Sequence, residues 1–297
     1  MNVWWAEYVE FGRNDRRHSI VVLIMDMGVQ GLNMGDTVAP AETLRLAELV
    51  EQLGYRSWWA AEHVVLPSPR VDPSPSEPDT NLLDPLINLS FVAAATSRLE
   101  LGTGIVILPQ RNPVVLAKQV ASLDVLSSGR FTLGVGAGYL TQEMTAVGVP
   151  LADRGRRTDE YIDAMRALWH SPAPAYDGKY VSFSGVDAHP RPSNARIAVG
   201  GASDGALRRA LVRGNAWIGV GTPEETAANL KRIRRLSAIT ERPESLGALE
   251  INVVATAALD ASVVRQYEDL GVDQLIVFPS SVDMPLDEAL AKLITLR

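Results

Sequence analysis

The sequence contains no cysteine. This absence excludes disulfides, thiolate metal ligands, iron–sulfur clusters and cysteine nucleophiles. Histidine is also scarce: His18, His63, His170 and His189 are scattered along the chain. No HExxH motif and no carboxylate cluster accompanies them, so we predict no metal site.

Long apolar runs and an excess of positive charge are missing as well. No run approaches the ~18 apolar residues of a membrane span, and the first residues lack the apolar centre of a secretory signal. The 28 basic and 35 acidic residues leave a net charge of −7, which argues against binding to nucleic acid or a membrane surface. We therefore expect a cytoplasmic protein that meets any anionic ligand with local cations.

What the chain does contain is one repeated unit, a short apolar run followed by a capped helix. The runs occupy residues 25–31, 56–61, 99–107, 131–136, 196–199, 216–220, 249–255 and 273–278. Strict alternation of such runs with helices is typical of a parallel sheet covered by helices. A doubly wound open sheet is the alternative, but eight such runs favour closure into a (β/α)8 TIM barrel.

The expected helices have recognisable ends. Asn112 before Pro113 is predicted to cap one helix, and Gly129 follows the last apolar residue of that helix. Thr222 and Glu225 have the spacing of a capping box, in which each side chain bonds the backbone amide of the other residue.

Two stretches interrupt the alternation. Residues 64–83 contain prolines at positions 67, 69, 73, 75 and 78, too many for a helix, and so long a loop in a compact domain is commonly a lid. Residues 176–192 combine alternating aromatic residues with a glycine turn, which predicts a hairpin-like insertion after the fourth helix. We expect both segments to cover part of a site.

His63 stands at the end of the second apolar run, directly after Glu62 and before the lid. In a TIM barrel the active site lies where the carboxyl ends of the strands meet the following loops. The position therefore favours a functional histidine. The alternative is a histidine that caps the strand or bonds a backbone carbonyl.

Glycines mark the ends of two further runs. Gly134, Gly136 and Gly138 end the fourth run, and Gly200 and Gly201 end the fifth. Such turns allow a ligand to approach the backbone and expose amides that can bind a phosphate. Tight turns with positive φ are the alternative explanation, but two of them beside a candidate histidine favour a cofactor site.

Arg154, Arg156 and Arg157 open the helix that runs to Trp169. Cations at a helix N-terminus oppose the helix dipole, so an anionic ligand is one explanation for the cluster. The other explanation is a solvated helix end whose arginines pair with neighbouring carboxylates.

Four segments together resemble the bacterial luciferase-like monooxygenase superfamily, in particular its actinobacterial deazaflavin branch, which uses coenzyme F420. They are "AAEHVVLP", "LGTGIVILPQRNPVVLAKQVASLDVLSSGRFTLGVGAGYLTQEM", "RTDEYIDAMRALW" and "VGGASDGALRRA". The resemblance begins near Met25 and implies a TIM barrel with an insertion, a flavin or deazaflavin in its mouth and a homodimer. Residues 1–20 are then an N-terminal appendage to a luciferase-like domain over residues 21–297.

The resemblance also implies roles for particular residues. Glu62 and His63 match the pair beside the reactive ring, and His63 is the candidate proton donor or stabiliser of ring charge. Thr103, Gly104 and Ile105 match the segment that packs beneath the ring. A non-proline cis peptide is expected there, at Gly104–Ile105. The ring-lining turn matches Gly136, Ala137 and Gly138, and the phosphate-binding amides match Gly200 and Gly201. The acidic tail of F420 would be met by Arg154, Arg156 and Arg157.

Tyr139 departs from the family pattern. The sugar-phosphate dehydrogenases of the family have a glutamate there, so the tyrosine argues against that activity and makes Tyr139 a second catalytic candidate. We predict an F420-dependent oxidoreductase that transfers a hydride between deazaflavin and a small organic substrate. The alternatives are an FMN-dependent monooxygenase that uses O₂ and a deazaflavin carrier without enzymatic activity.

Deletion of the residues before Ser19 tests the appendage. Because the resemblance begins near Met25 and residues 10–17 show no apolar period, we expect the melting temperature and the cofactor affinity to stay nearly unchanged. A large loss of either would instead favour docking of Val3, Trp4 and Trp5 on a partner subunit, since exposed aromatic residues are common at interfaces.

Overall fold

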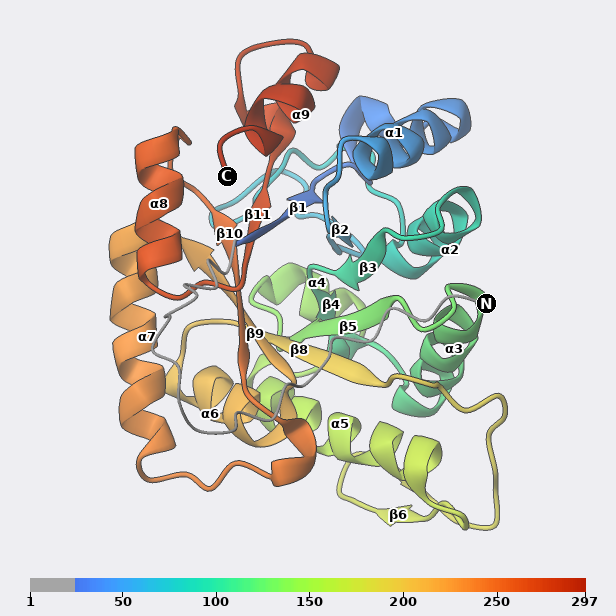
Figure 1. The fold of residues 1–297 in the computed structure, drawn as a ribbon. Helices are drawn as coiled ribbons and strands as arrows, with labels where there is room; N and C mark the ends of the chain where they lie inside the picture. The colour runs from blue at the N-terminus through green and yellow to red at the C-terminus, as the bar shows by residue number, and fades with distance from the viewer. Residues whose placement is uncertain (1–24) are drawn as a thin grey trace, which may run out of the picture.

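The computed structural model describes residues 25–297, and within them a parallel sheet closes into a barrel (Figure 1). The strand order is β3-β2-β1-β11-β10-β9-β8-β5-β4, and pairing of β3 with β5 closes the ring. The barrel strands are β1 (Asp26–Gln30), β2 (Ser57–Ala60), β3 (Glu100–Thr103), β4 (Val106–Ile107), β5 (Phe131–Gly136), β8 (Arg196–Gly200), β9 (Ala216–Gly221), β10 (Glu250–Ala255) and β11 (Gln274–Val277). The predicted TIM barrel is therefore confirmed.

Helices surround the strands (Figure 1). They are α1 (Pro40–Gln52), α2 (Pro85–Ala95), α3 (Pro113–Leu126), α4 (Thr141–Ala146), α5 (Arg154–His170), α6 (Asp204–Arg213), α7 (Pro223–Ser237), α8 (Ala261–Asp269) and α9 (Leu286–Ile294). Two predicted helix starts are confirmed. The Asn112 side chain accepts from the Val114 and Val115 amides, and Thr222 with Glu225 forms a complete capping box. The expected appendage, residues 1–20, lies outside the described residues.

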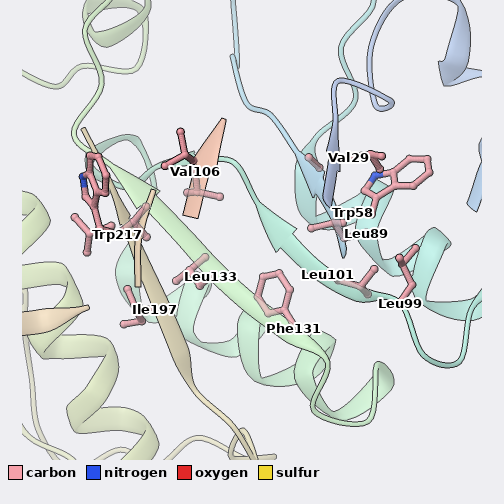
Figure 2. Packing of buried hydrophobic residues seen from close by; sticks show 14 of the residues in the cluster. Val29, Trp58, Leu89, Leu99, Leu101, Val106, Phe131, Leu133, Ile197 and Trp217 are labelled. Atoms are coloured by element: carbon pink, nitrogen blue, oxygen red, sulfur yellow. The ribbon is translucent and has the colours of Figure 1, made fainter. Parts of the chain in front are cut away.

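Two apolar clusters follow from the alternation of side chains along each strand. Trp58 points outward into the large cluster between barrel and helices, part of which Figure 2 shows. Trp59, the next residue, belongs to the small cluster inside the barrel. Its indole lies over Gly102, where a Cβ would come within 2.3 Å of the ring. The inner cluster also contains Ile218 and Val254, with Ile105 and Phe278 packed against it.

The structure differs from the sequence-based prediction at two places along the barrel wall. The single run expected at residues 99–107 is divided into β3 and β4. The carbonyl of Gly104, between them, accepts from the Gln30 side chain. In addition, α4 precedes α5 in the fourth unit; its short sequence was not predicted as a helix.

The insertion after α5 contains the two-stranded antiparallel sheet of β6 (Tyr176–Asp177) and β7 (Ser182–Phe183). Its turn is held by Glu160 of α5, whose carboxylate accepts from the amides of Lys179, Tyr180 and Val181. No residue of the insertion lines the pocket described below. The hairpin was therefore predicted correctly, but its expected cover over the site was wrong, because Glu160 holds it against the outside of the barrel.

Arg130 offers a test of how the barrel is held together at its amino-terminal end. Its guanidinium donates to the carbonyls of Ala93, Thr96 and Leu99, which joins the end of α2 to β3. Arg130→Ala leaves these acceptors without a partner, and we expect it to lower the free energy of unfolding by about 2–3 kcal/mol.

Arg98→Ala is the matched control in denaturant unfolding. The Arg98 side chain is 73% exposed and lies 3.8 Å from Glu51, so its removal should cost less than about 0.5 kcal/mol. Equal losses for the two variants would contradict the structural role of Arg130.

Candidate active site

A pocket of about 960 Å³ opens at the carboxyl ends of the barrel strands. All but three of the sequence-predicted site residues line it, namely Glu62, His63, Gly104, Ile105, Gly136, Ala137, Gly138, Tyr139, Arg154, Gly200 and Gly201. Its lining also includes Ile218 and Val254 of the inner cluster. The barrel core is therefore part of the floor of the pocket.

His63 is fixed by a buried carboxylate. Its Nδ1 lies 3.0 Å from Oε2 of Glu143, a residue of α4 whose side chain is fully buried. The other carboxylate oxygen, Oε1, accepts from the Val64 amide at 2.7 Å. A carboxylate can only accept, so Nδ1 carries a proton and Nε2 is the ring nitrogen left for a ligand.

Tyr139 lies beside this histidine. The two rings meet edge to face, with centroids 5.9 Å apart and an interplanar angle of 89°. Burial raises the pKa of Tyr139 above its ordinary value, and the negative charge of Glu143 raises it further. The phenol therefore remains a neutral hydroxyl at physiological pH.

Glu62 is buried, and its hydrogen bonds hold the wall of the pocket together. Oε2 accepts from the Ile107 amide at 2.5 Å, and Oε1 accepts from Nε of Arg111 at 2.9 Å. Arg111 also bonds Asp84, the cap of α2, at 2.6 Å. Burial raises the pKa of Glu62, and the guanidinium of Arg111 opposes that rise. Glu62 thus joins the end of β2 to β4 and α2.

Gln30, at the end of β1, is a pocket residue that the sequence did not suggest. Its Nε2 donates to the Gly104 carbonyl at 2.5 Å, and because a carbonyl only accepts, this bond fixes the orientation of the amide. Oε1 is then a buried acceptor without a hydrogen-bond partner among the described residues. The adjoining Gly104–Ile105 peptide is cis, as predicted.

The glycines at the ends of β5 and β8 allow Ile105 to pack closely against the backbone at the floor of the pocket. A Cβ at Gly136 would lie 2.6 Å from Cδ1 of Ile105, and one at Gly200 would lie 3.1 Å from Cγ2 of Ile105. Gly138 and Gly201 have φ values of +81° and +108°, a backbone conformation that favours glycine. Both explanations considered for these glycines therefore apply, since Gly138 and Gly201 form turns with positive φ and all four glycines line the pocket.

The first turn of α6 forms one side of the pocket through Ser203, Gly205 and Ala206. Helix N-termini present backbone amides and a partial positive charge to anions. Arg154 lines the pocket on the same side, and its Nη1 donates to the Leu151 carbonyl. This side of the pocket is therefore suited to a phosphate or a carboxylate.

The remaining sequence candidates lie away from the pocket lining. Arg156 is exposed and pairs with Asp153 at 2.8 Å. Arg157 lies over the ring of Tyr180 in the insertion, 4.4 Å from its centroid. Thr103 is buried below the pocket and donates to the Gly134 carbonyl. The three arginines are thus separated by the helix, and only Arg154 reaches the pocket.

Residues 25–297 contain neither a group of potential metal ligands nor a membrane-spanning helix. No three His, Asp or Glu side chains of these residues are grouped so as to hold a metal ion. None of their helices is long and apolar enough to cross a membrane.

Sequence comparison places the chain in the family of luciferase-like monooxygenases, whose profile matches residues 21–277. The chain belongs to this family of oxidoreductases. An uncharacterised protein of Mycobacterium tuberculosis is 38% identical over 170 residues, which cover 54% of the chain and 59% of that protein. The chain thus matches about three fifths of the length of this relative.

Two solved structures share the fold. A monooxygenase from Streptomyces bottropensis, RslO1, has a TM-score of 0.71 at 23% identity, covering 92% of the chain and 97% of that structure. An F420-dependent secondary alcohol dehydrogenase, solved with an F420–acetone adduct, has a TM-score of 0.76 at 15% identity, covering 92% and 98%. The fold therefore occurs both in a monooxygenase and in an F420-dependent enzyme.

Glu143→Gln tests how His63 is held. Because the Val64 amide occupies the oxygen of the new side chain, its NH₂ group must donate to Nδ1 and the ring proton must move to Nε2. We expect ¹⁵N NMR of the neutral imidazole to show the Nδ1–H tautomer in the wild type and the Nε2–H tautomer in the variant. The exposed Glu48→Gln variant should leave the tautomer unchanged. The same tautomer in all three proteins would refute the contact.

Proposed function

We propose that the protein is an F420-dependent oxidoreductase that acts on a small organic substrate. One observation carries the proposal: the glycine turns after β5 and β8, the first turn of α6 and His63 line one continuous pocket. Such a pocket can hold an elongated cofactor with a flat ring at one end and a phosphate at the other.

The residues present fit a flavin-type cofactor. Gly136 and Gly200 let the side chain of Ile105 lie close against the backbone, and these three residues line the pocket with an apolar surface that suits a flat ring. The unpartnered Oε1 of Gln30 suits a ring N–H. The amides of the first turn of α6 suit the phosphate. Arg154, on the same side of the pocket, suits the acidic tail that distinguishes F420 from FMN.

When bound, reduced F420 would supply a hydride, whereas reduced FMN would react with O₂. The protein's own residues hold and move the proton. Glu143 occupies Nδ1 of His63, so Nε2 is the ring nitrogen left to accept a proton from the reacting group. The neutral hydroxyl of Tyr139 lies beside this histidine and can donate a proton.

An FMN-dependent monooxygenase is the second candidate. It is favoured by the likeness of the fold to the Streptomyces monooxygenase, whereas the glycine turns suit both cofactors and favour neither. The acidic tail of F420 is the part that distinguishes the two cofactors. Arg154 favours F420 because it offers this tail a cation in the pocket. A homodimer, a cytoplasmic location and the absence of nucleic-acid and membrane partners stay predictions.

Cofactor titration tests the proposal. We expect F420 to bind with a Kd of about one micromolar or less and FMN to bind much more weakly, as measured by fluorescence of each cofactor. Arg154→Ala should weaken F420 binding by about tenfold at low salt and by less at high salt, because salt screens exposed charges. Arg156→Ala, whose side chain pairs with Asp153 outside the pocket, should have little effect.

His63→Ala should lower turnover by about a hundredfold and change the F420 affinity little, since it removes a proton-transfer group. Tight FMN binding with rapid O₂ consumption would overturn the assignment in favour of the monooxygenase. Tight F420 binding without turnover of any reducible substrate would favour the carrier.

A further inference from the structure

The pocket has two unlike sides. Its polar side is formed by α5, the end of β8 and the first turn of α6, with Arg154 and Ser203. The opposite side is formed by the loop after β1, the lid of residues 64–83 and the residue after β11. This side carries Met34, Leu66, Pro75, Leu82 and Phe278, with the uncharged hydroxyl residues Ser76 and Thr80 of the lid, and we call it the apolar side because it has no charged residue. In the strand order, β1 and β8 stand across the barrel from each other.

Within residues 25–297, the charged side chains that line the pocket are already paired with opposite charges, apart from Arg154. Glu62 pairs with Arg111, and Arg209 bonds Asp159 at 2.7 Å. His63 bonds Glu143. Among the described pocket residues, Arg154 alone is a cation without a carboxylate partner, and it belongs to the polar side. The apolar side therefore offers nothing that would neutralise an anion.

The apolar wall is held in place by buried hydrogen bonds. Met34 and Leu82 form an antiparallel β-bridge, which brings the loop after β1 against the end of the lid. Asn33, fully buried, donates from its side chain to the carbonyls of Ala61 and Leu83 at 2.9 and 3.0 Å. Asn33 thus joins Ala61, which precedes the lid, to Leu83 at the end of the lid, and this holds Leu82 in the wall.

We propose that the substrate is an uncharged molecule with a largely apolar body that lies against Met34, Leu82 and Phe278, with one uncharged polar group beside His63 and the hydroxyl of Tyr139, which can donate to it. This inference rests on the proposed function, because it assigns the polar side of the pocket to the cofactor. An anionic substrate would lose its water beside apolar walls without gaining a cation, whereas an uncharged one would gain from apolar contact.

Two probes of the same shape test the proposal. Benzylacetone is a methyl ketone, and hydrocinnamate replaces its acetyl group with a carboxylate. Calorimetric titration into protein saturated with F420 should show that the ketone binds at least about tenfold more tightly than the carboxylate. Equal binding, preference for the carboxylate or binding of neither probe would overturn the proposal.

Leu82→Arg should reverse or abolish the preference, because it adds a cation to the apolar wall. Val71→Arg is the matched control: Val71 lies in the same lid, is exposed and does not line the pocket, so the wild-type preference should remain. A folded Leu82→Arg variant with the wild-type preference would also overturn the proposal. If the Leu82→Arg variant does not fold, the ratio of the two probe affinities in the wild type decides whether the proposal holds.

The result of the probe titration can be distinguished from a failure of the cofactor assignment. F420 affinity is measured first and independently, so failure of F420 to bind counts against the proposed function. The same two probes are then titrated in the presence of FMN. A ketone preference there supports the substrate class while the cofactor assignment fails.

Discussion

Closure of the sheet through the pairing of β3 with β5 is the constraint on which the site depends. In register, Leu101 lies beside Phe131 and Gly102 beside Thr132. This pairing completes a ring of parallel strands whose carboxyl ends all open on one side. The closure therefore brings residues that are far apart in sequence to one pocket, namely His63, Gly104, Gly136 and Gly200.

Because of the same closure, the side chains that fill the interior of the barrel also form the floor of the pocket. Ile218 and Val254 fill the inside of the barrel and also lie at the floor of the pocket. Ile105 packs on this inner cluster. It occupies the space that a Cβ at Gly136 or Gly200 would take. A change in the volume of the inner cluster therefore reaches the ligand surface directly, since protein interiors are closely packed.

Two buried carboxylates hold the loops that carry the chemistry. Glu62 bonds the Ile107 amide and Arg111, and Glu143 bonds the Val64 amide and His63. Each carboxylate thus bonds one backbone amide and one side chain, and burial would be costly without those partners. The result is a histidine whose ring orientation is set before a ligand arrives, a form of preorganisation that favours proton transfer.

The sequence by itself determined the order of the eight strand-and-helix units, the glycine turns and the position of His63 at a strand end, because alternation, capping and turn chemistry are local. It did not indicate Glu143, Gln30 or Arg111, whose partners lie 80, 74 and 49 residues away. It also grouped Arg156 and Arg157 with Arg154, although the helix turns them out of the pocket, toward Asp153 and Tyr180. Only the tertiary structure decided which of these side chains meet, because that depends on how the closed barrel brings distant loops together.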